Sequence, residues 1–178
     1  MGRIFVTSDL HFNHDKDFIW KARGFNSVQE MNEELIKRYN SVVQDEDTVY
    51  ILGDSMMGMN VNEGLAYLRR LKGTKYLALG NHDTNARVEA YKNSGIFAGV
   101  EFAYRLKVKG KQFHLTHYPT ITANGDEGIK VFNLYGHTHQ TTNFYENNKF
   151  MYHIGVDSHD CYPVAIEDII EEIEKENK

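Results

Sequence analysis

The chain is poor in residues that cross-link or interrupt a fold: one cysteine and two prolines stand among its 178 residues. Cys161 alone cannot form an internal disulfide, so we expect a reducing compartment and predict a cytoplasmic protein. No apolar run approaches the ~20 residues that a membrane-spanning helix needs. The polar start "GRIFVTSDLHF" is typical of a first strand rather than a signal peptide. We therefore predict no membrane partner.

Positive charge is also scarce, because the chain has 20 basic and 25 acidic residues and a formal net charge of −5. This balance argues against tight, non-specific nucleic-acid binding, although a small local site could still bind phosphate. Four common catalytic motifs are missing as well: G-x-x-x-x-G-K-[ST], G-x-G-x-x-G, H-E-x-x-H and G-x-S-x-G. The sequence does not indicate an oligomeric state.

Short apolar segments rich in β-branched and aromatic residues recur along the chain and predict strands. They cover residues 3–8, 48–52, 75–79, 102–108, 111–116, 131–135 and 150–155. The pair that flanks Lys109-Gly110 predicts a hairpin.

Helical patterns fill the gaps between these strands. Ser27 with Glu30 predicts the start of one helix, and Asn60 with Glu63 predicts the start of a second. Residues 84–94 predict a third, and isoleucines at helical spacing between 166 and 173 predict a C-terminal one. No repeat or linker divides the chain, so we predict a single α/β domain over residues 1–178, with strands parallel early and antiparallel late.

Five of the predicted strands end in side chains that can bind a metal. These are Asp9 and His11, Asp54, Asn81 with His82 and Asp83, His117, and His137 with His139. Each motif alone is weak, because Gly-Asp is a common turn and a lone histidine usually packs or faces solvent. In α/β sheets, however, ligands bind at the carboxyl ends of strands, so we expect these residues to converge.

The local spacing refines this expectation. Residues two apart in an extended segment project to one face, so Asp9 and His11 are predicted to hold one centre, and His137 and His139 to do the same. The neighbours Asn81 and His82 diverge, so that one can bind a metal while the other faces a substrate. Glycines 53, 80 and 136 would allow close backbone approach. We expect Asn13 and His14 to be near enough to line the pocket, and His114 and His153 to be structural.

The candidate metal ligands are imidazoles, carboxylates and one amide, with no thiolate: Asp9, His11, Asp54, Asn81, His117, His137 and His139. This mixture suits manganese, iron, cobalt, nickel or zinc better than the all-oxygen cages of calcium or magnesium. Seven ligands are too many for one tetrahedral site. We therefore predict two divalent transition-metal ions, manganese first among them, with Asp54 as the bridge.

The series "DLH", "GD", "GNHD", "THYP" and "GHTH" resembles the calcineurin-like metallophosphoesterase superfamily, from Asp9 to Ile173. The stretches "EMNEELIKRYNSVV", "DTVYILGD" and "IGVD" are similar to its small, cap-less bacterial and phage-type members. The resemblance implies a two-sheet mixed β-sandwich flanked by helices. It also implies that one ion is bound by Asp9, His11, Asp54 and His139, and a second by Asp54, Asn81, His117 and His137. His82 would then be the proton donor, and Asp83 would orient its imidazole.

These features predict a metal-dependent phosphoric-ester hydrolase in which two ions share a water of lowered pKa and so supply a hydroxide nucleophile. Phosphodiesters are favoured over monoesters, because the fold should be open and the stretch "GDSMMGM" lacks the phosphate-holding Arg of the protein-phosphatase branch. Two alternatives stay open. One is a nuclease or cyclic-nucleotide phosphodiesterase, although the sequence shows no aromatic-rich basic groove that would support it. The other is a catalytically silent scaffold, like the retromer subunit of this architecture, which would need no stoichiometric metal.

Overall fold

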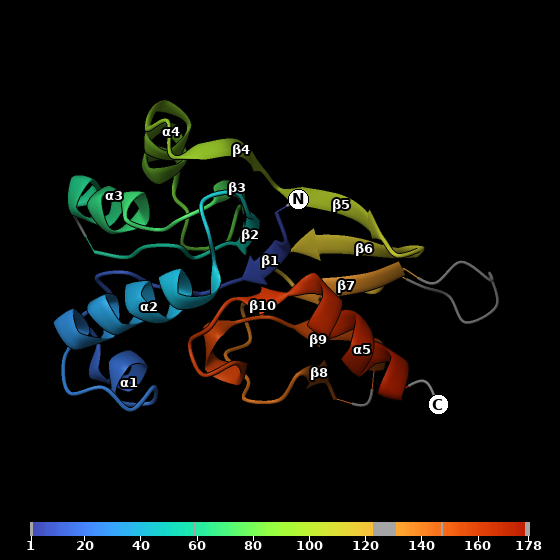
Figure 1. Cartoon of the computed structure of the whole chain (residues 1–178). Helices are drawn as coiled ribbons and strands as arrows, with labels where there is room; N and C mark the ends of the chain where they lie inside the picture. Colours follow the sequence, from blue (N-terminus) through green and yellow to red (C-terminus); the bar gives the residue numbers. More distant parts are fainter. Residues whose placement is uncertain (1, 59, 123–130, 147, 177–178) are drawn as a thin grey trace.

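The computed structural model describes residues 2–58, 60–122, 131–146 and 148–176, in which strands alternate with helices over the first half of the chain (Figure 1). The strands are β1 (Ile4–Thr7), β2 (Thr48–Leu52), β3 (Thr74–Ala78), β4 (Phe97–Glu101), β5 (Ala103–Val108), β6 (Lys111–Thr116), β7 (Val131–Tyr135), β8 (Phe144–Tyr145), β9 (Asn148–His153) and β10 (Val164–Ala165). The helices are α1 (Asp17–Trp20), α2 (Val28–Val42), α3 (Val61–Arg69), α4 (Asn85–Asn93) and α5 (Ile166–Glu176).

The first sheet has the order β10-β1-β2-β3-β4, with β1 to β4 parallel and β10 antiparallel at the edge. Helices α2, α3 and α4 make the crossovers that parallel neighbours require. Two of them begin at the predicted caps: Ser27 accepts the backbone N–H of Glu30 at 3.1 Å, and Asn60 accepts that of Glu63 at 3.3 Å.

The second sheet has the order β5-β6-β7-β9-β8. Strands β5 and β6 form the predicted hairpin, whose turn residues Lys109 and Gly110 both have positive φ. The expectation of antiparallel late strands is wrong for β6, β7 and β9, which pair in parallel. Residues 117–130 separate β6 from β7, and a connection of this length allows consecutive strands to pair in parallel. The two strands follow one another in the chain but do not form a hairpin.

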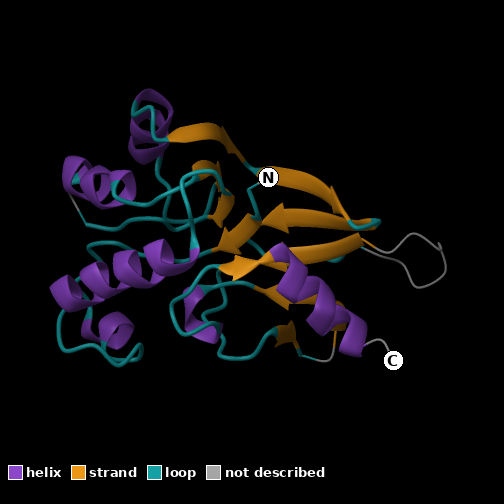
Figure 2. Ribbon diagram, viewed as in Figure 1, coloured by secondary structure: helices purple, strands orange, loops and turns teal. Residues whose placement is uncertain are grey.

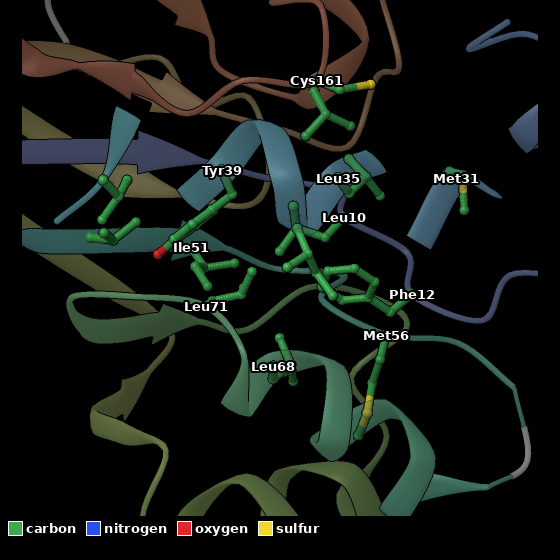
Figure 3. Close-up of a cluster of buried hydrophobic side chains, with 14 of the residues drawn as sticks. Leu10, Phe12, Met31, Leu35, Tyr39, Ile51, Met56, Leu68, Leu71 and Cys161 are labelled. Atoms are coloured by element: carbon green, nitrogen blue, oxygen red, sulfur yellow. The ribbon is translucent and has the colours of Figure 1, made fainter. Parts of the chain in front are cut away.

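The two sheets and their helices enclose two apolar clusters. Because strand side chains alternate, Phe5 of β1 packs with α2 and α3, whereas its neighbour Val6 faces the second sheet and α5. Figure 3 shows the first cluster, where Tyr39 of α2 lies near Ile51 of β2. The second cluster contains the four isoleucines of α5.

The structure confirms the fold class: two mixed sheets flanked by helices, as Figure 2 shows. Strands β4, β8 and β10 and helix α1 were not predicted. Three of these four are two to four residues long, and β4 is a half-exposed edge strand that carries Gly99, so none has a strong apolar pattern. No helix of the described ranges is long and apolar enough to cross a membrane.

Candidate metal centre

The carboxyl ends of β1, β2, β3, β6 and β7 meet in one place, and each is followed by predicted metal ligands. The parallel pairing explains this convergence, since parallel strands carry their carboxyl ends to the same edge of a sheet. The seven predicted ligands form two groups around Asp54.

The first group, here called the Asp9 group, consists of Asp9, His11 and His139. Asp9 Oδ1 lies 3.9 Å from His11 Nε2 and 4.0 Å from His139 Nε2. Asp9 Oδ1 and His11 Nε2 are buried and have no hydrogen-bond partner among the described residues. A buried polar atom without a partner costs roughly 1–3 kcal/mol, and a cation between these atoms would offset that cost. The donor set therefore fits a metal ion.

The second group, here called the Asn81 group, consists of Asn81, His117 and His137. His117 Nδ1 donates to the Leu52 carbonyl at 2.8 Å, so Nε2 is the ring nitrogen that faces the group. This Nε2 lies 2.8 Å from Asn81 Oδ1, and His137 Nδ1 lies 2.9 Å from the same oxygen. Acceptor atoms thus converge on one point, which suits a cation.

Asp54 stands between the two groups. Its Oδ2 is 3.8 Å from His11 Nε2 and 3.4 Å from His117 Nε2. Its Oδ1 accepts the backbone N–H of His82 at 2.9 Å, which holds the carboxylate in place. With one oxygen fixed and the other facing both groups, Asp54 has the position of a bridging ligand.

Burial sets the protonation of several of these side chains. Burial raises the pKa of Asp9, because the ionised carboxylate loses hydration. Burial lowers the pKa of His11 well below its usual value, and burial followed by the neighbouring His117 lowers that of His137. The two imidazoles are therefore neutral at pH 7, the form that binds metals, and a cation would relieve the unfavourable burial of the Asp9 charge.

The backbone at the centre is strained. A positive φ, uncommon in residues other than glycine, occurs at five of the seven predicted ligands: Asp9, His11, Asp54, His137 and His139, with φ between 49° and 71°. Such conformations persist where the surrounding structure enforces them and cluster at functional sites.

Glycines admit the close approach, as predicted. Gly53 has φ +86°, and a Cβ there would lie 2.5 Å from His117 Nδ1. A Cβ at Gly80 would overlap Asp54 Oδ1, and one at Gly136 would overlap Asp9 Oδ2. Side chains at these positions would displace the His117 imidazole, the Asp54 carboxylate and the Asp9 carboxylate, respectively.

Two residues that the sequence reasoning did not single out hold the Asp9 group from outside. His139 Nδ1 lies 2.7 Å from Asp157 Oδ2, and Arg23 Nε donates to Asp157 Oδ1 at 2.8 Å. Arg23 also donates to the backbone carbonyls of Asp9 and Leu10 at 2.8 and 3.2 Å. Burial alone would raise the pKa of Asp157, but the hydrogen bond to His139 and the Arg23 guanidinium outweigh it and hold the pKa far below its usual value.

An ionised Asp157 therefore orients the His139 ring so that Nε2 points at Asp9, the arrangement found around metal-bound histidines. The sequence could have indicated Asp157 as a site residue, because it follows the strand of residues 148–153 just as the other site residues follow their strands.

The structure corrects two expectations. Asp83 does not orient the His82 imidazole: its Oδ2 accepts backbone N–H groups of Gly80 and Asp54 at 2.8 and 3.2 Å, and its Oδ1 accepts the Tyr91 hydroxyl at 2.9 Å. Asp83 thus ties the end of β2 to the end of β3.

The second correction concerns His137 and His139, which do not share one centre. His139 belongs to the Asp9 group and His137 to the Asn81 group. The prediction assumed an extended backbone, whereas both residues have a positive φ, so their side chains do not project to one face. Asn81 and His82 do diverge: the His82 ring lies on the other side of Asp54, with Nε2 3.9 Å from Asp54 Oδ2.

The remaining histidines have the surroundings expected of them. His14 Nδ1 lies 3.3 Å from His11 Nδ1, so His14 lines the edge of the centre, and Asn13 precedes it. His153 is buried, contacts Ser158 Oγ at 2.7 Å, and burial lowers its pKa to about 3. His114 is half-buried on β6, opposite Arg105 of β5.

Known proteins resemble this chain over most of its length. The chain is 32% identical to the uncharacterized protein MJ1445 of Methanocaldococcus jannaschii, over 98% of this chain and 93% of that protein. It is 28% identical to the gene 66 protein of Mycobacterium phage L5, over 89% of this chain and 88% of that protein. The crystal structure of AQ665 from Aquifex aeolicus, a protein of unknown function, superposes with a TM-score of 0.72 at 22% identity, over 97% of this chain and all of that one, and so shows the same fold.

A sequence model of one family covers almost the whole chain. It is described as calcineurin-like phosphoesterase and matches residues 2–178. The match includes every strand end that contributes to the centre. The chain therefore belongs to the calcineurin-like phosphoesterase family.

Proposed function

We propose that the protein is a metal-dependent hydrolase of phosphoric esters that uses two divalent transition-metal ions. The observation that carries the proposal is the convergence of the Asp9 group and the Asn81 group on Asp54, with lone pairs of buried atoms left unpaired. Asp9, His11, Asp54 and His139 would hold one ion, and Asp54, Asn81, His117 and His137 the other. Bound divalent cations neutralise phosphate oxygens and lower the pKa of water, which is the chemistry that ester hydrolysis needs.

His82 is the proposed proton donor. Its backbone N–H is fixed by Asp54, while its side chain is 42% exposed at the mouth of the centre. The ring can thus reach a substrate while the backbone stays in place. Protonation of the leaving oxygen by a positioned imidazole is a common form of general acid catalysis.

We propose a preference for phosphodiesters, for a reason of charge. A monoester dianion carries one more negative oxygen than a diester and benefits from a free guanidinium. Among the described residues around the centre, Arg23 is engaged by Asp157 and two carbonyls, and Arg87 by the carbonyls of His82 and Gly58. Neither offers a free guanidinium to a third phosphate oxygen.

Initial rates of the manganese-loaded protein on bis(p-nitrophenyl) phosphate and p-nitrophenyl phosphate test both parts. We expect the diester to react faster, and two metal ions per chain by elemental analysis. Faster monoester cleavage would overturn the preference. A protein that binds two ions but cleaves neither ester would overturn the hydrolase proposal, and one that binds none would favour the scaffold alternative. His114→Ala is the control, since His114 lies on β6 outside the centre.

A further inference from the structure

Two large apolar side chains are exposed next to the centre. Phe18 is 66% exposed and Tyr118 is 47% exposed, although burying such rings would be favourable. Other exposed apolar side chains occur elsewhere, among them Phe102 at 81%. Scattered single residues of this kind are common. These two rings, however, both lie against histidines at or beside the centre: Phe18 against His14, and Tyr118 against His117 and His137.

Phe18 lies beyond the His11 end of the centre. Its ring is 5.9 Å from that of His14 in an edge-to-face contact, and the His14 ring is 5.0 Å from His11 and 6.5 Å from His82. Phe18 sits on the short helix α1, and the next residue, Ile19, is buried and anchors that helix. The exposed ring is therefore held on the side where His82 would protonate a leaving group.

Tyr118 lies at the opposite end. Its ring is 5.1 Å from that of His117 and 4.9 Å from that of His137. The Tyr118 carbonyl accepts the hydroxyls of Thr116 and Thr120 at 2.8 and 3.0 Å, so the backbone that carries the ring is fixed. Asp54 stands between His11 and His117, and a phosphate on the ions that Asp54 would share would thus have one exposed aromatic ring on each side.

We propose that Phe18 and Tyr118 are base-stacking subsites, and that the natural substrates are short phosphodiesters with a nucleobase on both sides of the phosphate. This inference rests on the proposed function and adds a substrate class to it. Aromatic side chains stack on nucleobases with little regard to sequence. The net charge of −5 and the lack of a basic groove favour short substrates over long nucleic acids.

Competition assays separate the stacking contribution from phosphate binding. The assay follows hydrolysis of ethyl p-nitrophenyl phosphate by the manganese-loaded protein and compares the inhibition constants of dithymidine phosphate and diethyl phosphate. Both competitors carry one negative charge, so the ratio of the two constants reports on the nucleosides, and the change of that ratio in a ring variant reports on stacking. We expect wild type to prefer dithymidine phosphate. Phe18→Ala and Tyr118→Ala should each reduce that preference by about 5-fold or more.

Two control variants accompany these substitutions. Tyr118→Phe should retain the preference, because stacking needs the ring and not the hydroxyl. Phe102→Ala removes an even more exposed ring, which lies between β4 and β5, and should leave the ratio unchanged. An unchanged ratio in both Phe18→Ala and Tyr118→Ala, with ethyl p-nitrophenyl phosphate still cleaved, would overturn the subsites and spare the hydrolase proposal. No cleavage of that ester by wild type would instead overturn the hydrolase proposal.

Discussion

The two ends of the metal centre are held in different ways. In the Asp9 group the facing atoms stand 3.9 and 4.0 Å apart, and the outer residues Asp157 and Arg23 keep His139 and the backbone of Asp9 in position. In the Asn81 group the facing atoms are 2.8 to 3.2 Å apart, and His117 donates to the backbone carbonyl of Leu52. The Asp9 group is thus held by two charged side chains outside the ligand set, and the Asn81 group by a backbone carbonyl of β2.

This difference has a consequence for folding and for function. The Asp9 group depends on Arg23 and Asp157, which are 134 residues apart, so it forms only when the whole chain has folded. Changes outside the ligand set should therefore weaken the first ion more than the second. The predictions below follow from this comparison, from the largest expected effect to the smallest.

Asp54 is the residue that both groups share, so its replacement should affect both ions. Asp54→Asn keeps the shape but removes the charge that faces His11 and His117. We expect loss of detectable hydrolysis and a metal content well below two per chain by elemental analysis. Retention of two ions with wild-type activity would show that Asp54 is not the bridge.

His82 belongs to neither group, so its replacement should spare the metal content. His82→Ala should lower the rate by about 10²–10⁴-fold on esters with poor leaving groups. The loss should be smaller on p-nitrophenyl esters, whose leaving group needs little protonation. Equal losses on phenyl and p-nitrophenyl diesters would argue against the proton-donor role.

Replacement of Asp157 tests the difference between the Asp9 group and the Asn81 group. Asp157→Asn weakens the support of His139 without touching the Asn81 group, and loss of such outer partners typically costs about 10–100-fold in metal affinity or activity. Calorimetric titration with manganese should show one weakened and one unaffected site. Asp160→Asn is the matched control, because only the backbone carbonyl of Asp160 makes a hydrogen bond, with Arg38. Equal weakening of both sites would contradict the comparison.

Metal removal should destabilise the folded protein, because Asp9 Oδ1 and His11 Nε2 then remain buried without partners. At manganese concentrations about 100 times the Kd, binding to the native state adds about 2.7 kcal/mol to the free energy of unfolding. Thermal unfolding with and without a chelator should show a lower Tm without metal. Asp54→Asn should respond less to the chelator than wild type does.

The sequence predicted the strand ends well because local patterns determine them. Alternating apolar runs that stop at Gly-Asp, Gly-Asn-His-Asp or Gly-His-Thr-His are visible without any tertiary information. Three things were not visible. The left-handed backbone at His137 and His139 separated two residues that an extended strand would have aligned. The contact of Asp83 with Asp54 and that of Asp157 with Arg23 depend on how distant segments pack.

Anomalous diffraction from a manganese-soaked crystal tests the central claim most directly. We predict two peaks about 3.5–4 Å apart, one in contact with the Asp9 group, one with the Asn81 group, and both with Asp54. A single peak away from Asp54, or no peak at this centre, would contradict the account.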